Sequence, residues 1–230
     1  MFRLENVTKV YSRRGREVVA LRTSSLEIEA GEFVAIVGPS GSGKTTLLSM
    51  LGGMLSPNGG RVWLGNSSLY DLPVNERARV RREKMGFVFQ TFNLVPYLTA
   101  VENVQVPLFL SGATTKEQRD RAISLLERVG LSDRLDHKPH EMSTGQQQRV
   151  GLARTLANDP SIVLADEPTG NLDPESRSRV LDFFDELHRE NHTIVMVTHD
   201  LAAAERAQRK LALCDGAVST TSQLALTRAA

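Results

Sequence analysis

The stretch Gly38-Pro39-Ser40-Gly41-Ser42-Gly43-Lys44-Thr45 decides how this chain folds. It satisfies the phosphate-loop pattern G-x-x-x-x-G-K-[ST] at every position. The apolar run Phe33–Val37 before it reads as a buried strand, and Thr46–Met54 after it has the composition of a helix opening. Strand, glycine-rich turn and helix N-terminus together predict a binding site for the phosphates of a nucleoside triphosphate.

The chemistry of this loop follows from its backbone and from two side chains. Glycines allow the chain to fold closely around an anion with N–H groups pointing inward, and the dipole of the following helix adds positive charge. We expect Lys44 to reach the β- and γ-phosphates and the Thr45 hydroxyl to ligate Mg²⁺. The alternative, a glycine-rich turn that binds nothing, is disfavoured by the strand and helix around it. The other residues expected to bind the nucleotide are Gly38, Ser40, Gly41, Ser42, Gly43 and Thr46.

Composition limits the possible partners. Charged residues make up 24% of the 230 residues but the net charge is only +1, so we expect no nucleic-acid partner. The densest basic run, Arg77–Lys84, reads more simply as a solvated helix face than as a nucleic-acid patch. A single cysteine, Cys214, excludes an intramolecular disulfide and a Cys-based zinc site.

The N-terminus has no apolar signal-peptide core, and no apolar run approaches the about 18 residues needed to span a bilayer. We therefore expect a cytoplasmic protein. If it works at a membrane, other subunits must supply the membrane span.

Short apolar runs alternate with helical patterns, which predicts an α/β fold with a largely parallel core sheet. The N-terminal segments Phe2–Tyr11 and Val18–Glu29 are polar and alternating, and they predict an antiparallel hairpin on one edge with Ser12–Arg16 as its turn. This hairpin would form an N-terminal antiparallel β subdomain beside the phosphate-loop core. The predicted core strands are Phe33–Val37, Phe87–Phe89, Ile162–Ala165, Thr193–Val197 and Lys210–Cys214.

Helical periodicity marks the rest of the chain. Apolar residues at 122, 125, 126 and 129, and again at 180, 183, 184 and 187, each line one face of a helix. No strand is predicted between about 91 and 155. We interpret residues 1–230 as one domain, with a core of about 1–90 and 156–230 and an inserted helical subdomain of about 91–155. The last dozen residues, from Ser219, lack strong periodicity and are expected to fray.

Two acidic residues, Asp166 and Glu167, follow the predicted strand Ile162–Ala165. They lie at the edge where parallel sheets bind ligands. Asp166 fits the carboxylate that holds the Mg²⁺ hydration shell, and Glu167 is placed to activate the attacking water as a general base. In a chain without a phosphate loop, these two residues would be interpreted more simply as a solvated strand end. Because this chain has a phosphate loop, the roles in Mg²⁺ binding and catalysis are favoured.

A second run, Ser143-Thr144-Gly145-Gln146, opens another helix. Its serine hydroxyl and its backbone N–H groups can bind an anion. The alternative is an ordinary N-cap serine. The phosphate loop already accounts for nucleotide binding by this chain, so a second anion-binding helix must serve another purpose.

Taken in their order along the chain, these motifs resemble an ATP-binding-cassette ATPase over nearly the whole length. The family's elements occur here as Tyr11, Gly38–Thr45, Gln90, Ser143–Gln146, Asp166-Glu167, Asn171–Asp173 and His199. In detail the chain is similar to the subfamily that serves lipoprotein release, macrolide export and cell-division complexes. That likeness lies in the run LADEPTGNLD at 164–173, in Phe89-Gln90 followed by Phe92–Leu94, and in Asp215-Gly216.

The resemblance implies a role for each isolated residue. Tyr11 would stack on adenine, Gln90 would contact Mg²⁺ or the water, and His199 would hydrogen-bond the γ-phosphate. Taken singly, these residues would read as a core aromatic, a surface glutamine and a structural histidine. Asp173 would lie at a subunit contact. The implied catalytic residues are Lys44, Gln90, Glu167 and His199, and the implied Mg²⁺ ligands are Thr45, Gln90 and Asp166.

One position departs from the family pattern. The signature usually reads Leu-Ser-Gly-Gly-Gln, whereas here it is Met142-Ser143-Thr144-Gly145-Gln146. The residues implied to face ATP, Ser143, Gly145 and Gln146, are kept. In the family the signature of one subunit covers the ATP held by the other. The resemblance therefore implies a head-to-tail homodimer around two ATP molecules that drives integral membrane permease subunits from the cytoplasmic face of the membrane.

Two classes of function remain open. The first is the ATPase of a membrane export or lipoprotein-extraction complex. The second is a non-transport ATPase, such as a cell-division regulator with a membrane partner or a soluble DNA-repair or translation factor. The soluble factors are disfavoured because they typically need a coiled-coil insertion or two fused cassettes, whereas Lys44 and Ser143 are only 99 residues apart and there is one phosphate loop. A phosphate-loop kinase would lack the signature helix and His199.

Overall fold

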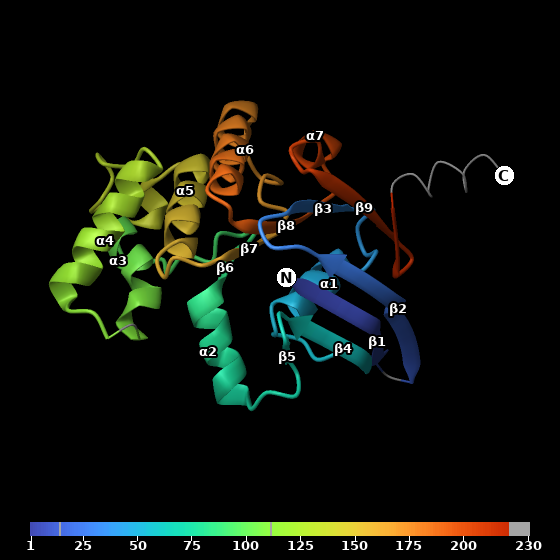
Figure 1. The fold of residues 1–230 in the computed structure, drawn as a ribbon. Coiled ribbons are helices and arrows are strands. Elements are labelled where there is room, and N and C mark those ends of the chain that lie inside the picture. The colour runs from blue at the N-terminus through green and yellow to red at the C-terminus, as the bar shows by residue number, and fades with distance from the viewer. Residues whose placement is uncertain (14, 111, 221–230) are drawn as a thin grey trace.

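The computed structural model describes residues 1–13, 15–110 and 112–220 (Figure 1). Its centre is a six-stranded sheet of order β10-β9-β3-β8-β7-β6. Strands β9, β3, β8, β7 and β6 run parallel, and β10 is antiparallel to β9, which confirms the predicted parallel core. The strands are β3 (Phe33–Val37), β6 (Met85–Val88), β7 (Ile162–Asp166), β8 (Thr193–Thr198), β9 (Arg209–Cys214) and β10 (Ala217–Thr220).

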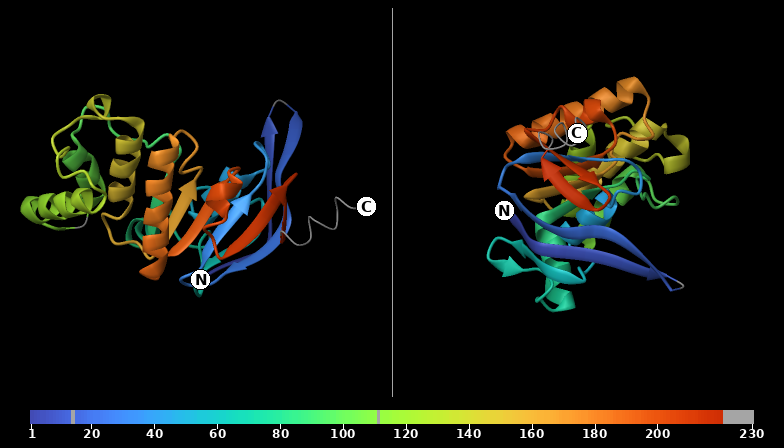
Figure 2. Two further views of the ribbon diagram at one scale, coloured as in Figure 1. Left: turned by 90° about the horizontal axis from the view of Figure 1, so that it is seen from above. Right: turned by 90° about the vertical axis from the view of Figure 1, so that its right-hand side faces the viewer.

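The predicted N-terminal hairpin is present as β1 (Phe2–Arg13) and β2 (Arg16–Ile28). Instead of lying along an edge of the parallel sheet, it forms an antiparallel sheet of its own, in the order β2-β1-β4-β5. The added strands β4 (Gly59–Leu64) and β5 (Ser67–Ser68) were not predicted. Figure 2 shows this sheet at the opposite end of the molecule from the yellow-green helices of residues 100–155.

Helices cover both faces of the parallel sheet. On one face lie α1 (Lys44–Leu51) and the antiparallel sheet, and on the other lies α6 (Pro174–Arg189), with the short α7 (Leu201–Ala204) against β3 and β8. Side chains of β7 alternate between the two cores, because successive residues of a strand point to opposite faces. Burial on both faces explains why these strands read as continuous apolar runs.

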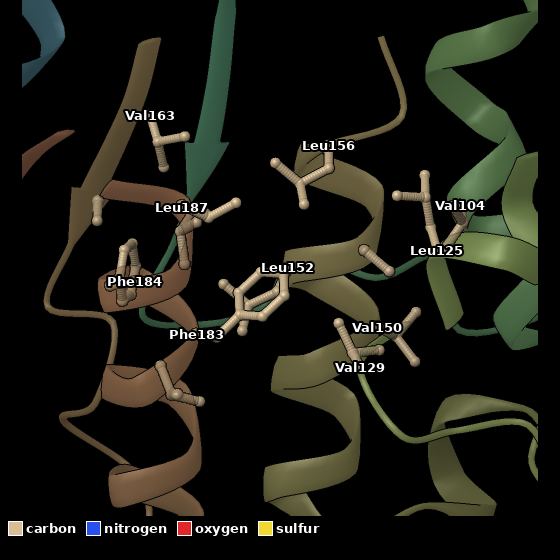
Figure 3. Packing of buried hydrophobic residues seen from close by; sticks show 14 of the residues in the cluster. Val104, Leu125, Val129, Val150, Leu152, Leu156, Val163, Phe183, Phe184 and Leu187 are labelled. Carbon is tan, nitrogen blue, oxygen red and sulfur yellow. The ribbon is translucent and has the colours of Figure 1, made fainter. Parts of the chain in front are cut away.

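The region between β6 and β7 is helical, as predicted. The apolar core between the parallel sheet and α6 continues into these helices. Figure 3 shows Leu152 of α5 beside Phe183 of α6. Its elements are α3 (Ala100–Gln105), the 3-10 turn η1 (Val106–Leu110), α4 (Thr115–Arg128), the 3-10 turn η2 (Pro139–Glu141) and α5 (Thr144–Thr155). This continuous core fixes the signature helix α5 against the sheet that carries the phosphate loop.

Several boundaries differ from the expectations. Helix α1 begins at Lys44, two residues earlier than expected, and β6 covers Met85–Val88 instead of Phe87–Phe89. Ser219 belongs to β10, so the expected fraying from that residue is wrong, while 221–230 lie outside the described residues. The basic run lies in α2 (Val74–Lys84), which contains no buried residue, as expected for a solvated helix. Among the described residues, no helix is both long and apolar enough to cross a bilayer.

Candidate functional site

A pocket of about 740 Å³ opens where the carboxyl ends of β3, β7 and β8 meet the N-terminus of α1. The predicted residues that line it are Tyr11, Ser40, Gly41, Gly43, Lys44, Thr45, Thr46, Gln90, Asp166, Glu167 and His199. Three further lining residues, Val18, Ala20 and Pro39, were not singled out from the sequence. Val18 and Ala20 are small apolar residues of the polar strand β2. They line the pocket because of the way the two sheets pack, which the sequence alone does not give.

Lys44 is the most enclosed charge of the pocket, with only 7% of its surface exposed. Its ammonium donates to the carbonyls of Gly38 (2.9 Å) and Pro39 (3.1 Å), and it lies 3.5 Å from the Glu167 carboxylate. These oxygens compensate a buried cation that would otherwise be costly to desolvate. An incoming phosphate would replace some of them as the partner of Lys44.

Steric constraints, in addition to anion binding, require glycine at two positions of the loop. Gly43 has φ +103°, and a Cβ there would lie 2.1 Å from the Ala20 carbonyl oxygen. A Cβ at Gly38 would lie 2.1 Å from the Leu213 carbonyl oxygen. Gly38 and Ser42, both predicted to bind nucleotide, do not line the pocket. They form the inner side of the loop, where it packs on β9.

Asp166 lies at the end of β7, beside the N-terminus of α1. The Thr45 hydroxyl donates to its carboxylate at 3.1 Å. Burial raises the pKa of Asp166, and the neighbouring Glu167 charge raises it further, against the opposing effects of the Thr45 hydrogen bond and of Lys44. A divalent cation bound between the hydroxyl and the carboxylate would stabilise the charged form.

Glu167 is held in an uncommon backbone conformation, with φ +45°. Its N–H donates to the Val197 carbonyl at 2.9 Å, which ties it to β8. The carboxylate accepts hydrogen bonds from the backbone N–H (3.1 Å) and ring Nδ1 (2.9 Å) of His199. Left-handed non-glycine residues are concentrated at functional sites, and this one aims a carboxylate at the phosphate loop.

Tyr11 and Gln90 complete the rim of the pocket. Tyr11 is 42% exposed, so the alternative of a core aromatic is wrong. Its hydroxyl lies 3.5 Å from the Thr46 hydroxyl. The Gln90 carbonyl accepts from the Asn171 side chain at 3.3 Å, so the segment after β6 is joined to the loop that leads into α6.

The signature run lies elsewhere. Ser143 caps α5: its hydroxyl accepts from the Gln146 N–H (3.3 Å), and the Gln146 side chain accepts from the Ser143 N–H (2.9 Å). Neither these residues nor Gly145 line the pocket. A Cβ at Gly145 would lie 2.2 Å from the Ser176 hydroxyl, so this glycine is required where α5 meets α6. The N-cap reading of Ser143 is therefore observed, and its role toward ATP remains a prediction. Thr144 is exposed.

A phosphate loop between β3 and α1, with Asp166 as the last residue of β7 and Glu167 directly after it, defines the class of phosphate-loop nucleoside triphosphatases. Within that class, the family described as "ABC transporter" matches residues 21–170. The chain belongs to this family, as its motifs predicted, and it is an ATP-hydrolysing nucleotide-binding subunit.

Named relatives give the same result. The chain is 49% identical to "Lipoprotein-releasing system ATP-binding protein LolD 1" of Chlorobium chlorochromatii, over 97% of this chain and 92% of that protein. It is 45% identical to "Macrolide export ATP-binding/permease protein MacB" of Brucella melitensis, over 95% of this chain but only 34% of that protein. The dimeric ATP-binding cassette MJ0796, solved in a post-hydrolysis state with ADP and Pi, matches with a TM-score of 0.89 and 42% identity, over 96% of this chain and 98% of that one.

Gly145→Ala tests the contact between α5 and α6. Because the new methyl group overlaps Ser176, the free energy of unfolding without nucleotide should fall by about 1–3 kcal/mol. Urea unfolding of Gly145→Ala, Ser176→Gly and the double variant checks this. The double variant should recover part of the loss, and strictly additive costs would show that the two residues do not constrain each other.

Asp166→Asn tests the buried carboxylate. The sign follows from its raised pKa: above that pKa the ionised group costs the metal-free fold free energy, and asparagine removes the charge but still accepts from Thr45. At pH 7 the metal-free variant should unfold at the same or a higher temperature, while Mg²⁺-dependent ATP hydrolysis is lost. A fall of about 3 °C in the unfolding temperature corresponds to about 1 kcal/mol at this chain length, and it would show that the Asp166 charge does not destabilise the metal-free fold.

Proposed function

We propose that two copies of the chain close head to tail around two ATP molecules and that hydrolysis drives a membrane permease. One observation carries the proposal: the phosphate-loop pocket and the signature residues Ser143–Gln146 lie on one chain but do not form one site. A second copy would bring its signature helix over the pocket of the first, and the first would do the same for the second. Two-fold symmetry therefore completes both sites and leaves neither signature helix unused. The dimeric state of the cassette MJ0796 supports this arrangement.

The residues present fit Mg²⁺. The Thr45 hydroxyl and Asp166 carboxylate, 3.1 Å apart, are oxygen ligands of the kind Mg²⁺ prefers. In the described part of the chain no three His, Cys, Asp or Glu residues group as a metal site, which suits an ion that takes its other ligands from phosphates and water. When bound, Mg²⁺ would neutralise phosphate charge. Gln90, which lines the pocket, would contact it or the water.

Hydrolysis would use the carboxylate of Glu167. It takes the proton of the attacking water as the water oxygen bonds to the γ-phosphorus and the bond to ADP breaks. His199, hydrogen-bonded to the same carboxylate, orients it and can then donate to the γ-phosphate. Lys44 moves from the Gly38 and Pro39 carbonyls to the phosphates. Tyr11, at the open end, would stack on adenine.

Opening of the dimer follows from loss of these contacts. ATP binds the closed dimer better because both halves contact it, and hydrolysis removes the γ-phosphate from that contact. Asp173 caps α6 through the N–H groups of Glu175 (3.1 Å) and Ser176 (3.0 Å), the residue against which Gly145 packs. This position supports its proposed role at the subunit contact.

A groove of about 500 Å³ offers the surface for the permease. Its floor includes Phe87 and Phe89, whose rings stack with centroids 6.0 Å apart. Arg81, Arg82 and Arg154 line it, and the described lining includes no acidic residue. Exposed apolar side chains lie in the same helical region, at Tyr97, Phe109 and Leu110. We infer that a permease segment with apolar and acidic side chains docks here, on the cytoplasmic face of the membrane.

The transported substrate is proposed from the relatives alone. The names of the LolD and MacB relatives favour lipoprotein release or macrolide export over other cargo. No residue of this chain contacts a cargo in the proposed mechanism, because the path lies in the permease.

Glu167→Gln tests the hydrolytic assignment. The variant should bind ATP, lose turnover by at least about 100-fold because the base is gone, and accumulate as an ATP-bound dimer. Turnover assays and sedimentation with and without ATP measure both effects. Lys44→Ala is the control and should lose ATP binding itself. Normal turnover in Glu167→Gln would remove Glu167 from the base role.

Arg82→Glu tests the groove. Charge reversal at its rim should abolish co-purification of permease subunits from detergent-solubilised membranes, because like charges then face each other. Arg79→Glu, on the same helix but outside the lining of the groove, should retain the partner. Equal recovery of the permease with both variants would show that the partner docks elsewhere.

A further inference from the structure

The loop after Gln90 has a backbone that its sequence does not favour. Phe92 and Asn93 are consecutive and both left-handed, with φ +55° and +49°. The Asn93 N–H donates to the Thr91 carbonyl at 2.5 Å, which closes a tight turn. Asparagine adopts this conformation more readily than most L residues, but a bulky aromatic residue rarely does, so the pair needs support from outside the loop.

That support comes from one guanidinium of α5. Arg154 donates through Nη1 to the Asn93 carbonyl (2.6 Å) and through Nη2 to the Phe92 carbonyl (2.5 Å). The planar fork of arginine matches two neighbouring carbonyls that point the same way. Burial lowers the pKa of Arg154, and no acidic side chain pairs with it among the described residues, so these carbonyls are its compensation.

Arg154 lies where the signature helix α5, the groove proposed for the permease and the turn after Gln90 meet. It is on the last turn of α5, the helix that Ser143 begins. It lines the groove proposed for the permease. The turn it holds starts one residue after Gln90, whose own carbonyl is held by Asn171 from the other side. Loss of the Arg154 bonds would release the turn at one end while Asn171 still held the other.

We propose that Arg154 is a positioning residue, which holds the left-handed turn at Phe92–Asn93 and through it sets Gln90 in the ATP pocket. It does not touch the nucleotide and acts through the loop. The inference rests on the proposed function of this pocket. Because Arg154 and Asn93 both line the groove, a segment bound in the groove would alter the position of Gln90 through this contact.

Arg154→Met is the test, with Arg149→Met as a matched control. Arg149 lies on the same helix, is also partly buried, and donates to two successive carbonyls, those of Val129 (3.0 Å) and Gly130 (3.1 Å), at the end of α4. Both variants lose the same kind of contact. Only the first should affect the loop near Gln90.

In Arg154→Met, amide hydrogen exchange of residues 91–95 should rise about 10-fold while that of α5 stays unchanged. The kcat for ATP should fall about 10-fold with the ATP dissociation constant within about two-fold of the parent, because the phosphate loop is intact. Arg149→Met should keep normal exchange at 91–95 and normal kcat.

A rescue distinguishes positioning from general stability. Adding Asn93→Gly to Arg154→Met should recover part of the kcat, because glycine adopts the left-handed conformation without a clamp. Normal kcat in Arg154→Met, no recovery by Asn93→Gly, or the same losses in Arg149→Met would overturn the proposal. If the parent chain itself failed to bind or hydrolyse ATP, the proposed function would fail instead.

Discussion

The contact between Lys44 and Glu167 is the interaction on which the rest of the site depends. Their charged groups lie 3.5 Å apart, and Lys44 is almost fully enclosed. The contact exists because β3, β8 and β7 are parallel neighbours, so the loop after β3 and the carboxylates at the end of β7 meet at one edge of the sheet. His199 follows β8, the strand between β3 and β7, and its ring binds the same Glu167 carboxylate. Topology, more than any single side chain, assembles this cluster.

The same topology keeps the signature residues away from the phosphate-loop pocket. Helix α5 is fixed against α6 by a continuous core and by the close contact of Gly145 with Ser176. Its signature residues therefore belong to a different surface from the phosphate-loop pocket. In the proposed dimer, a second copy would bring the signature residues of one subunit to the phosphate-loop pocket of the other. In the proposed complex, the groove with its three arginines and the clamped loop after Gln90 would connect a membrane partner to that shared site.

Local motifs made most of the site predictable. The phosphate loop, the carboxylates at the end of β7 and His199 after β8 all lie at strand ends. A motif that follows directly on a strand can be placed without knowledge of distant packing. The apolar runs of the parallel strands also predicted the sheet. Strand β4 was missed because Gly59-Gly60-Arg61 opens it with polar and flexible residues, and its pairing with β1 is made across a long separation in sequence. The left-handed backbone of Glu167, the requirement for Gly145 and the Arg154 clamp were not predictable for the same reason. Each is imposed by a residue distant in the chain, whose position only the tertiary packing determines.

Cross-linking between subunits tests the shared site most directly. In a Cys214→Ser background with Glu167→Gln to retain ATP, one copy would carry Ser40→Cys, at the pocket, and the other Thr144→Cys, at the start of α5. Both positions are exposed. The account predicts that a short bifunctional reagent joins the two different copies when ATP is present and not when it is absent. Cross-linking that is equally efficient without ATP, or absent with it, would contradict the claim that each site is completed by the other subunit.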